Sequence, residues 1–118
     1  MDFQVVFYRK TDGSEPVREF MDSLRPKLKS KIGRDLNKLQ QQNIALREPY
    51  AKYMGNGLFE LRIGQANDIA RAFYFFYEGR RIIVTNGFII IKKTDETPRT
   101  ELERARRYKR DWEERRPL

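Results

Sequence analysis

Residues 58–91 read LFELRIGQANDIARAFYFFYEGRRIIVTNGFIII, and this stretch decides the fold. Runs rich in Val, Ile, Phe and Tyr favour β-strands, and three such runs lie at 58–63, 69–77 and 81–91. Only the short turn 78–80 separates the last two runs, which is typical of a hairpin. We therefore predict a meander of three antiparallel strands.

The part of the chain before this meander changes to helical periodicity. Residues 3–8 predict a short strand, and the polar turn 11–14 after it ends in Ser14, which is placed to cap a helix. We expect a first helix at 15–24 and a second at 26–42, where apolar residues recur every three or four positions. The apolar stripe of the second helix comprises Leu28, Ile32, Leu36 and Leu39.

The remaining segments complete an α+β architecture. Residues 43–54 are expected to be a connector, 55–57 (GNG) a turn, and 99–115 a final helix. The connections within the meander are too short for crossover helices. We therefore predict a mainly antiparallel sheet, with two N-terminal helices and one C-terminal helix packed on it. The apolar side of the last helix comprises Leu102, Ala105, Tyr108 and Trp112.

Length and charge limit the class of protein. The 118 residues suffice for a single domain, spanning 1–118. The formal net charge is +8, which favours a polyanionic partner such as nucleic acid, because neutralising phosphates releases counterions. A membrane-surface protein or a plain basic binding module has the same overall charge.

The absence of two residue types restricts the chemistry. The chain contains neither Cys nor His, which excludes disulfides, thiolate nucleophiles, Cys/His zinc sites and imidazole acid–base catalysis. We expect no metal and no cofactor. No apolar run is long enough for a secretory signal or a membrane span, so we expect a cytoplasmic protein without membrane contact.

Charged residues interrupt the predicted sheet. Alternation along 58–63 places Glu60 and Arg62 together on one face, and Arg71 lies inside the apolar run 69–77. A guanidinium at such a position needs a partner or access to solvent, and Glu60 is the expected partner across the sheet. Two interpretations remain open: a structural Arg–Glu pair at a sheet edge, or a functional charge cluster.

A cationic concavity on the sheet is the functional interpretation. It suits metal-free attack of an RNA 2′-hydroxyl on the adjacent phosphate, because cations stabilise the added negative charge of the transition state. The expected catalytic residues are Arg71, Arg62, Lys92, Lys93 and Glu60. Glu60 or a lysine would act as base or acid. The expected RNA contacts are Lys52 at the rim, with Tyr74 and Tyr108 stacking on bases or donating to a phosphate.

The second helix also carries a basic stripe. Lys31, Arg34 and Lys38 lie on it, separate from the apolar stripe. Such a stripe is either an ordinary solvated face or a contact with RNA phosphates.

Several motifs resemble the RelE/ParE superfamily of toxins, and within it the phage-derived, HigB-like branch. They are GLFELR (57–62), RAFYF (71–75), NGF (86–88), KKT (92–94) and TP (97–98). The resemblance covers nearly the whole chain and includes the basic helix that follows the last motif.

The resemblance implies a RelE-like fold and a ribosome-dependent mRNA endonuclease, that is, an mRNA interferase that inhibits translation. It also implies a cognate HigA-like antitoxin, often a helix-turn-helix protein, as inhibitor, with the ribosome and mRNA as further partners. The family's basic strand positions correspond to Arg62, Arg71 and the pair Lys92 and Lys93. Two alternatives remain: a ParE-like inhibitor of DNA gyrase without RNase activity, and a non-catalytic basic module that binds RNA or the ribosome.

Overall fold

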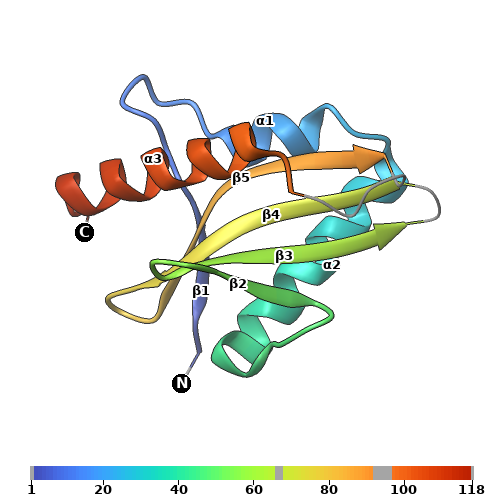
Figure 1. Cartoon of the computed structure of the whole chain (residues 1–118), viewed down its shortest axis with the longest axis horizontal. Coiled ribbons are helices and arrows are strands. Elements are labelled where there is room, and N and C mark those ends of the chain that lie inside the picture. Colours follow the sequence, from blue (N-terminus) through green and yellow to red (C-terminus); the bar gives the residue numbers. More distant parts are fainter. Residues whose placement is uncertain (1, 66–67, 92–96, 118) are drawn as a thin grey trace.

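The protein is a five-stranded sheet covered by helices on both faces (Figure 1). The computed structural model describes residues 2–65, 68–91 and 97–117. Its strands are β1 (Gln4–Phe7), β2 (Ala51–Gly55), β3 (Leu58–Gln65), β4 (Asp68–Tyr77) and β5 (Arg81–Ile91). Its helices are α1 (Pro16–Asp22), α2 (Pro26–Gln42), the short 3₁₀ turn η1 (Asn43–Ala45) and α3 (Arg99–Arg115).

The strand order in the sheet is β1-β5-β4-β3-β2. The pairs β5–β4, β4–β3 and β3–β2 are antiparallel, and β1 pairs with β5 in parallel. The predicted α+β class, a mainly antiparallel sheet with two N-terminal helices and one C-terminal helix packed on it, is confirmed. None of the helices in the described part of the chain is long and apolar enough to cross a membrane.

Helices α1 and α2 cover one face of the sheet. The predicted apolar stripe of α2 is buried, and Val17 of α1 is buried beside it. These side chains pack on residues from the middle of the sheet, including Leu61, Ile63, Ala72 and Val84. Pro26 begins α2 because a proline at the first helical position loses no hydrogen bond. We call this side the α2 face.

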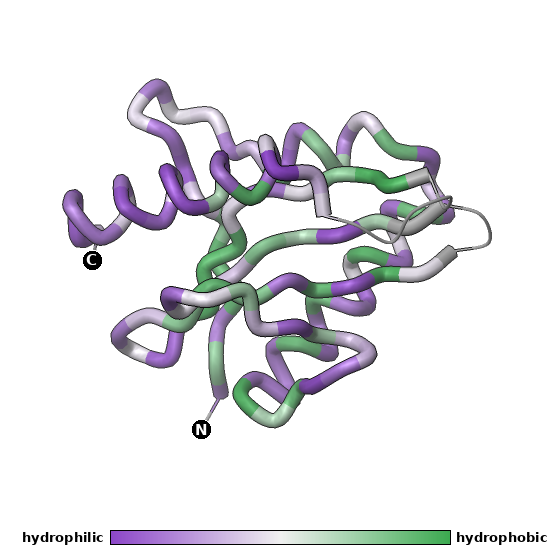
Figure 2. Tube along the Cα trace, in the orientation of Figure 1, coloured by the Kyte–Doolittle hydropathy of each residue, from purple (hydrophilic) through white to green (hydrophobic). Residues whose placement is uncertain are grey.

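Helix α3 covers the opposite face, which we call the α3 face, and contacts β4 and β5. Figure 2 shows that α3 is mostly hydrophilic along its length. Its apolar side is narrow: Ala105 and Trp112 are buried, and Leu102 and Tyr108 are partly buried beside them. On the sheet, this core consists of Leu58, Phe73, Phe75, Ile83, Phe88 and Ile90.

A β-bulge reverses the alternation along β5. The register with β4 shifts between Ala72 and Tyr74, so that Thr85 and Asn86 together lie opposite Phe73. Asn86 is thereby turned toward α3, where its amide donates to the carbonyl and the carboxylate of Glu101 at 3.3 and 3.2 Å. The bulge thus ties β5 to the first turn of α3.

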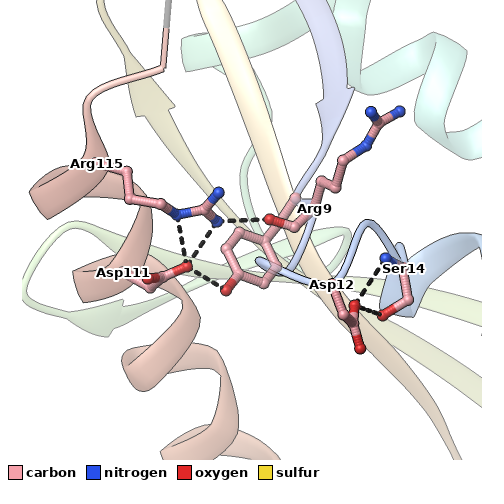
Figure 3. A network of polar contacts seen from close by, with 6 residues as sticks. Arg9, Asp12, Ser14, Asp111 and Arg115 are labelled. Carbon is pink, nitrogen blue, oxygen red and sulfur yellow. Dashed lines mark hydrogen bonds and ion pairs between the residues drawn. The ribbon is translucent and has the colours of Figure 1, made fainter.

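Two local predictions were wrong. Residues 51–55 were expected to be connector but form the edge strand β2, whose short, partly polar sequence lacks the apolar run of an inner strand. Ser14 does not cap α1, because its hydroxyl and backbone N–H both donate to Asp12 (Figure 3). Helix α1 begins instead at Pro16 and is shorter than the predicted 15–24.

The C-terminal half of α3 is fastened to the chain that follows β1 (Figure 3). The Tyr8 hydroxyl donates to Asp111 at 2.5 Å, and Arg115 donates both to Asp111 and to the carbonyl of Arg9. Burial, assisted by the hydrogen bond to Asp111, raises the pKa of Tyr8 to about 12. The same hydrogen bond lowers the pKa of Asp111. These contacts fix the direction of α3 across the sheet.

Candidate nucleic-acid interface

A strip of charged residues crosses β2, β3 and β4 on the α3 face. Residues directly opposite in antiparallel strands point to the same side. The register places Lys52 opposite Glu60 and Arg62 opposite Arg71. Because Glu60 and Arg62 are two residues apart in β3, all four side chains share this face. We call them the polar strip.

The two buried residues of the strip, Glu60 and Arg71, form a network with Thr97, which lies outside the strip and is partly exposed. Arg71 Nη1 donates to Glu60 Oε1 at 3.1 Å and to Thr97 Oγ1 at 3.2 Å. The Thr97 hydroxyl donates to the other carboxylate oxygen of Glu60 at 2.5 Å. The side chains of Glu60 and Arg71 are both 0% exposed. This network therefore satisfies a buried charge pair, as the low local dielectric requires.

The accessible part of the strip is cationic. Arg62 Nε lies 3.5 Å from Glu60 Oε1, and the Arg62 side chain remains 26% exposed. Lys52 is exposed on the neighbouring strand. Glu60 thus holds two guanidinium groups, one buried and one at the surface. The outer surface of the strip consequently presents positive charge on a rigid sheet, which suits a phosphate group.

A family comparison identifies the type of protein. Residues 19–110 match the family model described as phage-derived protein Gp49-like (DUF891). The chain belongs to the Gp49-like family. This is a RelE/ParE-like toxin family. No curated protein matches the sequence.

The structure of this Gp49-like protein brings four of the predicted site residues together, namely Lys52, Glu60, Arg62 and Arg71. The expected ion pair between Arg71 and Glu60 is present. It lies within the sheet and not at its edge, because β2 and β5 flank the two strands. Arg71 is 1% exposed, so it supports the strip from beneath while Arg62 and Lys52 form its surface. The predicted Lys92 and Lys93 lie outside the described residues.

The two predicted tyrosines of the Gp49-like chain do not join the strip. Tyr74 is buried on the α2 face, where it stacks on Phe59 at 5.3 Å between ring centroids. Burial raises the pKa of Tyr74 to about 12. Tyr108 stacks on Tyr8 with 4.6 Å between the ring centroids, and the hydroxyl of the same Tyr8 donates to Asp111 of α3. In this structure both tyrosine rings stack on other aromatic side chains of the protein.

The basic stripe of α2 lies on the other side of the sheet but approaches its edge. Lys31 and Lys38 line a hollow of about 280 Å³ together with Arg62 of the strip. Arg34 is exposed on α2 and does not line this hollow. Among the described residues, no group of three or more acidic side chains is gathered as metal ligands would be.

Sequence reasoning missed two residues of this region in the Gp49-like protein. Thr97 was noted only as part of a motif, and the loop before α3 gave no indication that its hydroxyl reaches Glu60. Tyr50, which lines the hollow, lies in the segment expected to be connector. A signal for Tyr50 existed, since it is an aromatic residue two positions before Lys52, which was predicted to lie at the rim.

Proposed function

We propose that this protein is the toxin of a toxin–antitoxin system, of the HigB-like branch, and that it is a ribosome-dependent mRNA endonuclease. The observation that supports this most is the polar strip, in which a buried carboxylate holds Arg62 at the surface beside Lys52. Membership of a RelE/ParE-like toxin family supports the same class of activity.

The proposed reaction is transesterification within the RNA. The 2′-oxygen attacks the adjacent phosphorus, the bond from phosphorus to the 5′-oxygen breaks, and the products carry a 2′,3′-cyclic phosphate and a 5′-hydroxyl. Negative charge increases on the phosphoryl oxygens in the transition state. We assign the stabilisation of that charge to Lys52 and Arg62, which share one face of the sheet. Lys92 and Lys93 are proposed as further cations because they follow β5 directly in the sequence.

The proton of the 2′-hydroxyl needs an acceptor. Glu60 is buried, but Thr97 donates its own proton to Glu60 and is itself partly exposed. We assign Thr97 as a relay that passes its proton to Glu60 and takes the proton of the nucleophile. Arg71 is then a positioning residue, since it holds both Glu60 and Thr97. The 5′-oxygen leaves on the opposite side of the phosphorus and takes a proton from water, and the proton on Glu60 then passes back through Thr97 to the solvent.

The proposed partners follow from the same reaction. A ribosome presents the mRNA, and the basic residues of α2, Lys31, Arg34 and Lys38, contact RNA phosphates. A HigA-like antitoxin, of the kind that carries a helix-turn-helix, blocks the toxin in the cytoplasm of the cell that makes it.

The decisive experiment combines growth with mapping of mRNA ends. Induction of the isolated protein should stop growth, and primer extension on translated mRNA should show new 5′ ends that depend on ribosomes. Arg62→Gln should reduce cleavage by about 10²–10³-fold in a protein that remains folded, because Glu60 keeps its contacts with Arg71 and Thr97. Arg18→Gln is the matched control, because Arg18 is an exposed arginine of α1, and it should cleave normally.

Three results would contradict this function: normal growth at confirmed expression, intact mRNA in arrested cells, or full cleavage by Arg62→Gln. A supercoiling assay on purified gyrase belongs beside the mapping. Growth arrest with intact mRNA and inhibited gyrase would replace the endonuclease with a ParE-like inhibitor.

A further inference from the structure

The hollow between α2 and the edge of the sheet has the features of a binding site for one nucleobase. It is lined by Lys31, Asp35, Lys38, Leu46, Tyr50, Leu61, Arg62 and Gly64. Its volume of about 280 Å³ lies just below the range for small-molecule pockets, which begins at about 300 Å³. It is therefore too small for an extended ligand but accommodates a single planar ring.

The hollow lies where the sheet narrows. Strand β2 pairs with β3 only as far as Leu61, and β3 continues beyond it to Gln65. The chain entering β2 stays close to this overhang, since the backbone N–H of Arg62 donates to the carbonyl of Tyr50 at 2.8 Å. Arg62 thus belongs both to the polar strip and to the hollow. Because Arg62 is common to both, a phosphate held by the strip and a base in the hollow can belong to the same RNA strand.

Tyr50 provides a surface for stacking. Its side chain is 51% exposed, although it is a large aromatic residue. The ammonium of Lys38 lies 4.3 Å from the centroid of its ring. Lys38 covers one face of the ring and leaves the other for stacking on an unpaired base, while the cations that line the hollow neutralise the RNA backbone.

The wall of the hollow also contains a hydrogen-bond acceptor. The Asp35 carboxylate is half-buried and lies 3.2 Å from Lys31 Nζ. An ionised carboxylate only accepts hydrogen bonds, so it pairs with the exocyclic amino group of adenine, cytosine or guanine. Uracil has no such group, and its one donor on the pairing edge, N3–H, lies between two carbonyl oxygens that repel a carboxylate. The chemistry of the wall therefore favours amino-bearing bases over uracil.

We propose that this hollow is a base-specificity site for single-stranded RNA, in which Tyr50 stacks on one base and Asp35 selects bases that carry an exocyclic amino group. The inference rests on the proposed function, because it places the base next to the phosphate held by the polar strip.

The test uses the full-length protein and fluorescein-labelled 2′-O-methyl oligouridines, in which one central nucleotide is A, C, G or U. Methylation removes the nucleophile, so anisotropy measures binding without cleavage. The wild-type protein should bind the A, C and G oligonucleotides at least about fivefold more tightly than the U oligonucleotide. Tyr50→Leu should weaken binding of the A, C and G oligonucleotides by about 5-fold to 150-fold.

Two further variants test whether the loss of binding is specific to Tyr50 and whether Asp35 sets the base preference. Tyr53→Leu removes another exposed tyrosine, three residues away and outside the hollow, and should leave binding unchanged. Asp35→Asn keeps the shape but presents donors as well as an acceptor, so the preference against uracil should shrink while overall binding persists. Melting temperatures of all variants confirm that each is folded.

The outcomes separate the two proposals. Equal binding by the wild-type protein and folded Tyr50→Leu, or no binding to any oligonucleotide, overturns the base site. Loss of binding in Tyr50→Leu alone supports the site, even where primer extension on the wild-type protein shows no cleavage and the endonuclease proposal fails. Where the wild-type protein does cleave, Asp35→Asn should also broaden the bases found at the cleaved positions.

Discussion

The two faces of the sheet are built on different principles. The α2 face is an apolar core closed by two helices, and its buried members are aliphatic or aromatic. The α3 face is covered by one helix that contacts β4 and β5, and the strip beyond it contains a buried Glu60 and a buried Arg71. Hydrophobic packing tolerates many substitutions of similar volume, whereas a buried charge network depends on every member. The α3 face therefore combines the greatest sensitivity of the fold with its candidate site.

The largest expected effect comes from removing one member of the charge network. Arg71→Ala leaves Glu60 buried without its principal partner, and the free energy of unfolding should fall by about 3–5 kcal/mol. Urea denaturation monitored by tryptophan fluorescence measures this, because Trp112 is the single tryptophan and lies in the core of the same face.

A double variant sharpens the same comparison. Glu60→Leu combined with Arg71→Met replaces the pair by apolar groups, as on the α2 face, and should recover most of the lost stability without recovering mRNA cleavage. If the single variant Arg71→Ala is as stable as the wild-type protein, the α3 face is no more sensitive to the loss of a buried residue than the α2 face.

The second effect concerns a close contact on the α2 face, between Gly87 of β5 and Phe20 of α1. A Cβ added at Gly87 would lie 2.5 and 2.7 Å from ring carbons of Phe20 in α1. Gly87→Ala should therefore cost about 1–3 kcal/mol of stability through overpacking, measured by thermal denaturation. Phe20→Leu in the same chain should relieve part of this cost.

Gly33 of α2 provides the opposite case, because nothing lies within 4 Å of an added Cβ there. Gly33→Ala should stabilise the protein by about 0.5–1 kcal/mol, since alanine restricts the unfolded chain and favours the helix. We expect Gly87→Ala to lower the melting temperature and Gly33→Ala to raise it. If both variants shift the melting temperature in the same direction, the effect of Gly87→Ala cannot be assigned to the contact with Phe20.

The third effect tests how α3 is held in place. Tyr8→Phe removes the hydrogen bond to Asp111, which is partly exposed, and should cost about 1.5 kcal/mol at pH 7. Because the pKa of Asp111 is lowered in the folded protein, this contribution is present above the ordinary value of 3.8 and is lost as the pH falls through the folded pKa.

The stability difference between Tyr8→Phe and the wild-type protein should therefore narrow below about pH 4. Chemical denaturation in a series of buffers measures this. A difference that is the same at pH 3 and pH 7 would assign the role of Tyr8 to packing against Tyr108.

The smallest effect concerns the salt dependence of RNA binding. Lys31→Gln and Lys38→Gln should each reduce the log–log slope of affinity against salt by about 0.7, the value for one phosphate of single-stranded RNA. Arg18→Gln, an exposed arginine of α1, should leave the slope unchanged. Unchanged slopes for the two lysine variants would make the basic side of α2 an ordinary solvated surface.

Periodicity predicted the long elements accurately. The bounds of α2 and α3 were as expected, because seventeen-residue amphipathic helices carry a repeated signal. The edge strand β2 was missed because only five residues form it and two of them, Lys52 and Tyr53, are exposed. Its pairing partner, not its own pattern, makes it a strand.

The site could be predicted only in part. The alternation of β3 and the isolation of Arg71 indicated the ion pair with Glu60 correctly. Tyr74 was grouped with Arg71, but three positions along a strand is an odd spacing, which places two side chains on opposite faces. The contact of Thr97 with Glu60 joins residues far apart in sequence through an irregular segment, and no local pattern encodes it.

The parallel pairing of β1 with β5 has a consequence for the order of folding. Val5 pairs with Ile82, and α3 is fastened to Tyr8 from still further along the chain. Loop closure over such separations is slow, and a chain made from its N-terminus has no partner for β1 until β5 has been synthesised. If the protein has the proposed activity, the emerging polypeptide should be harmless to the ribosome that produces it. Activity would begin only with the completed molecule, which would leave time for the proposed antitoxin to capture it.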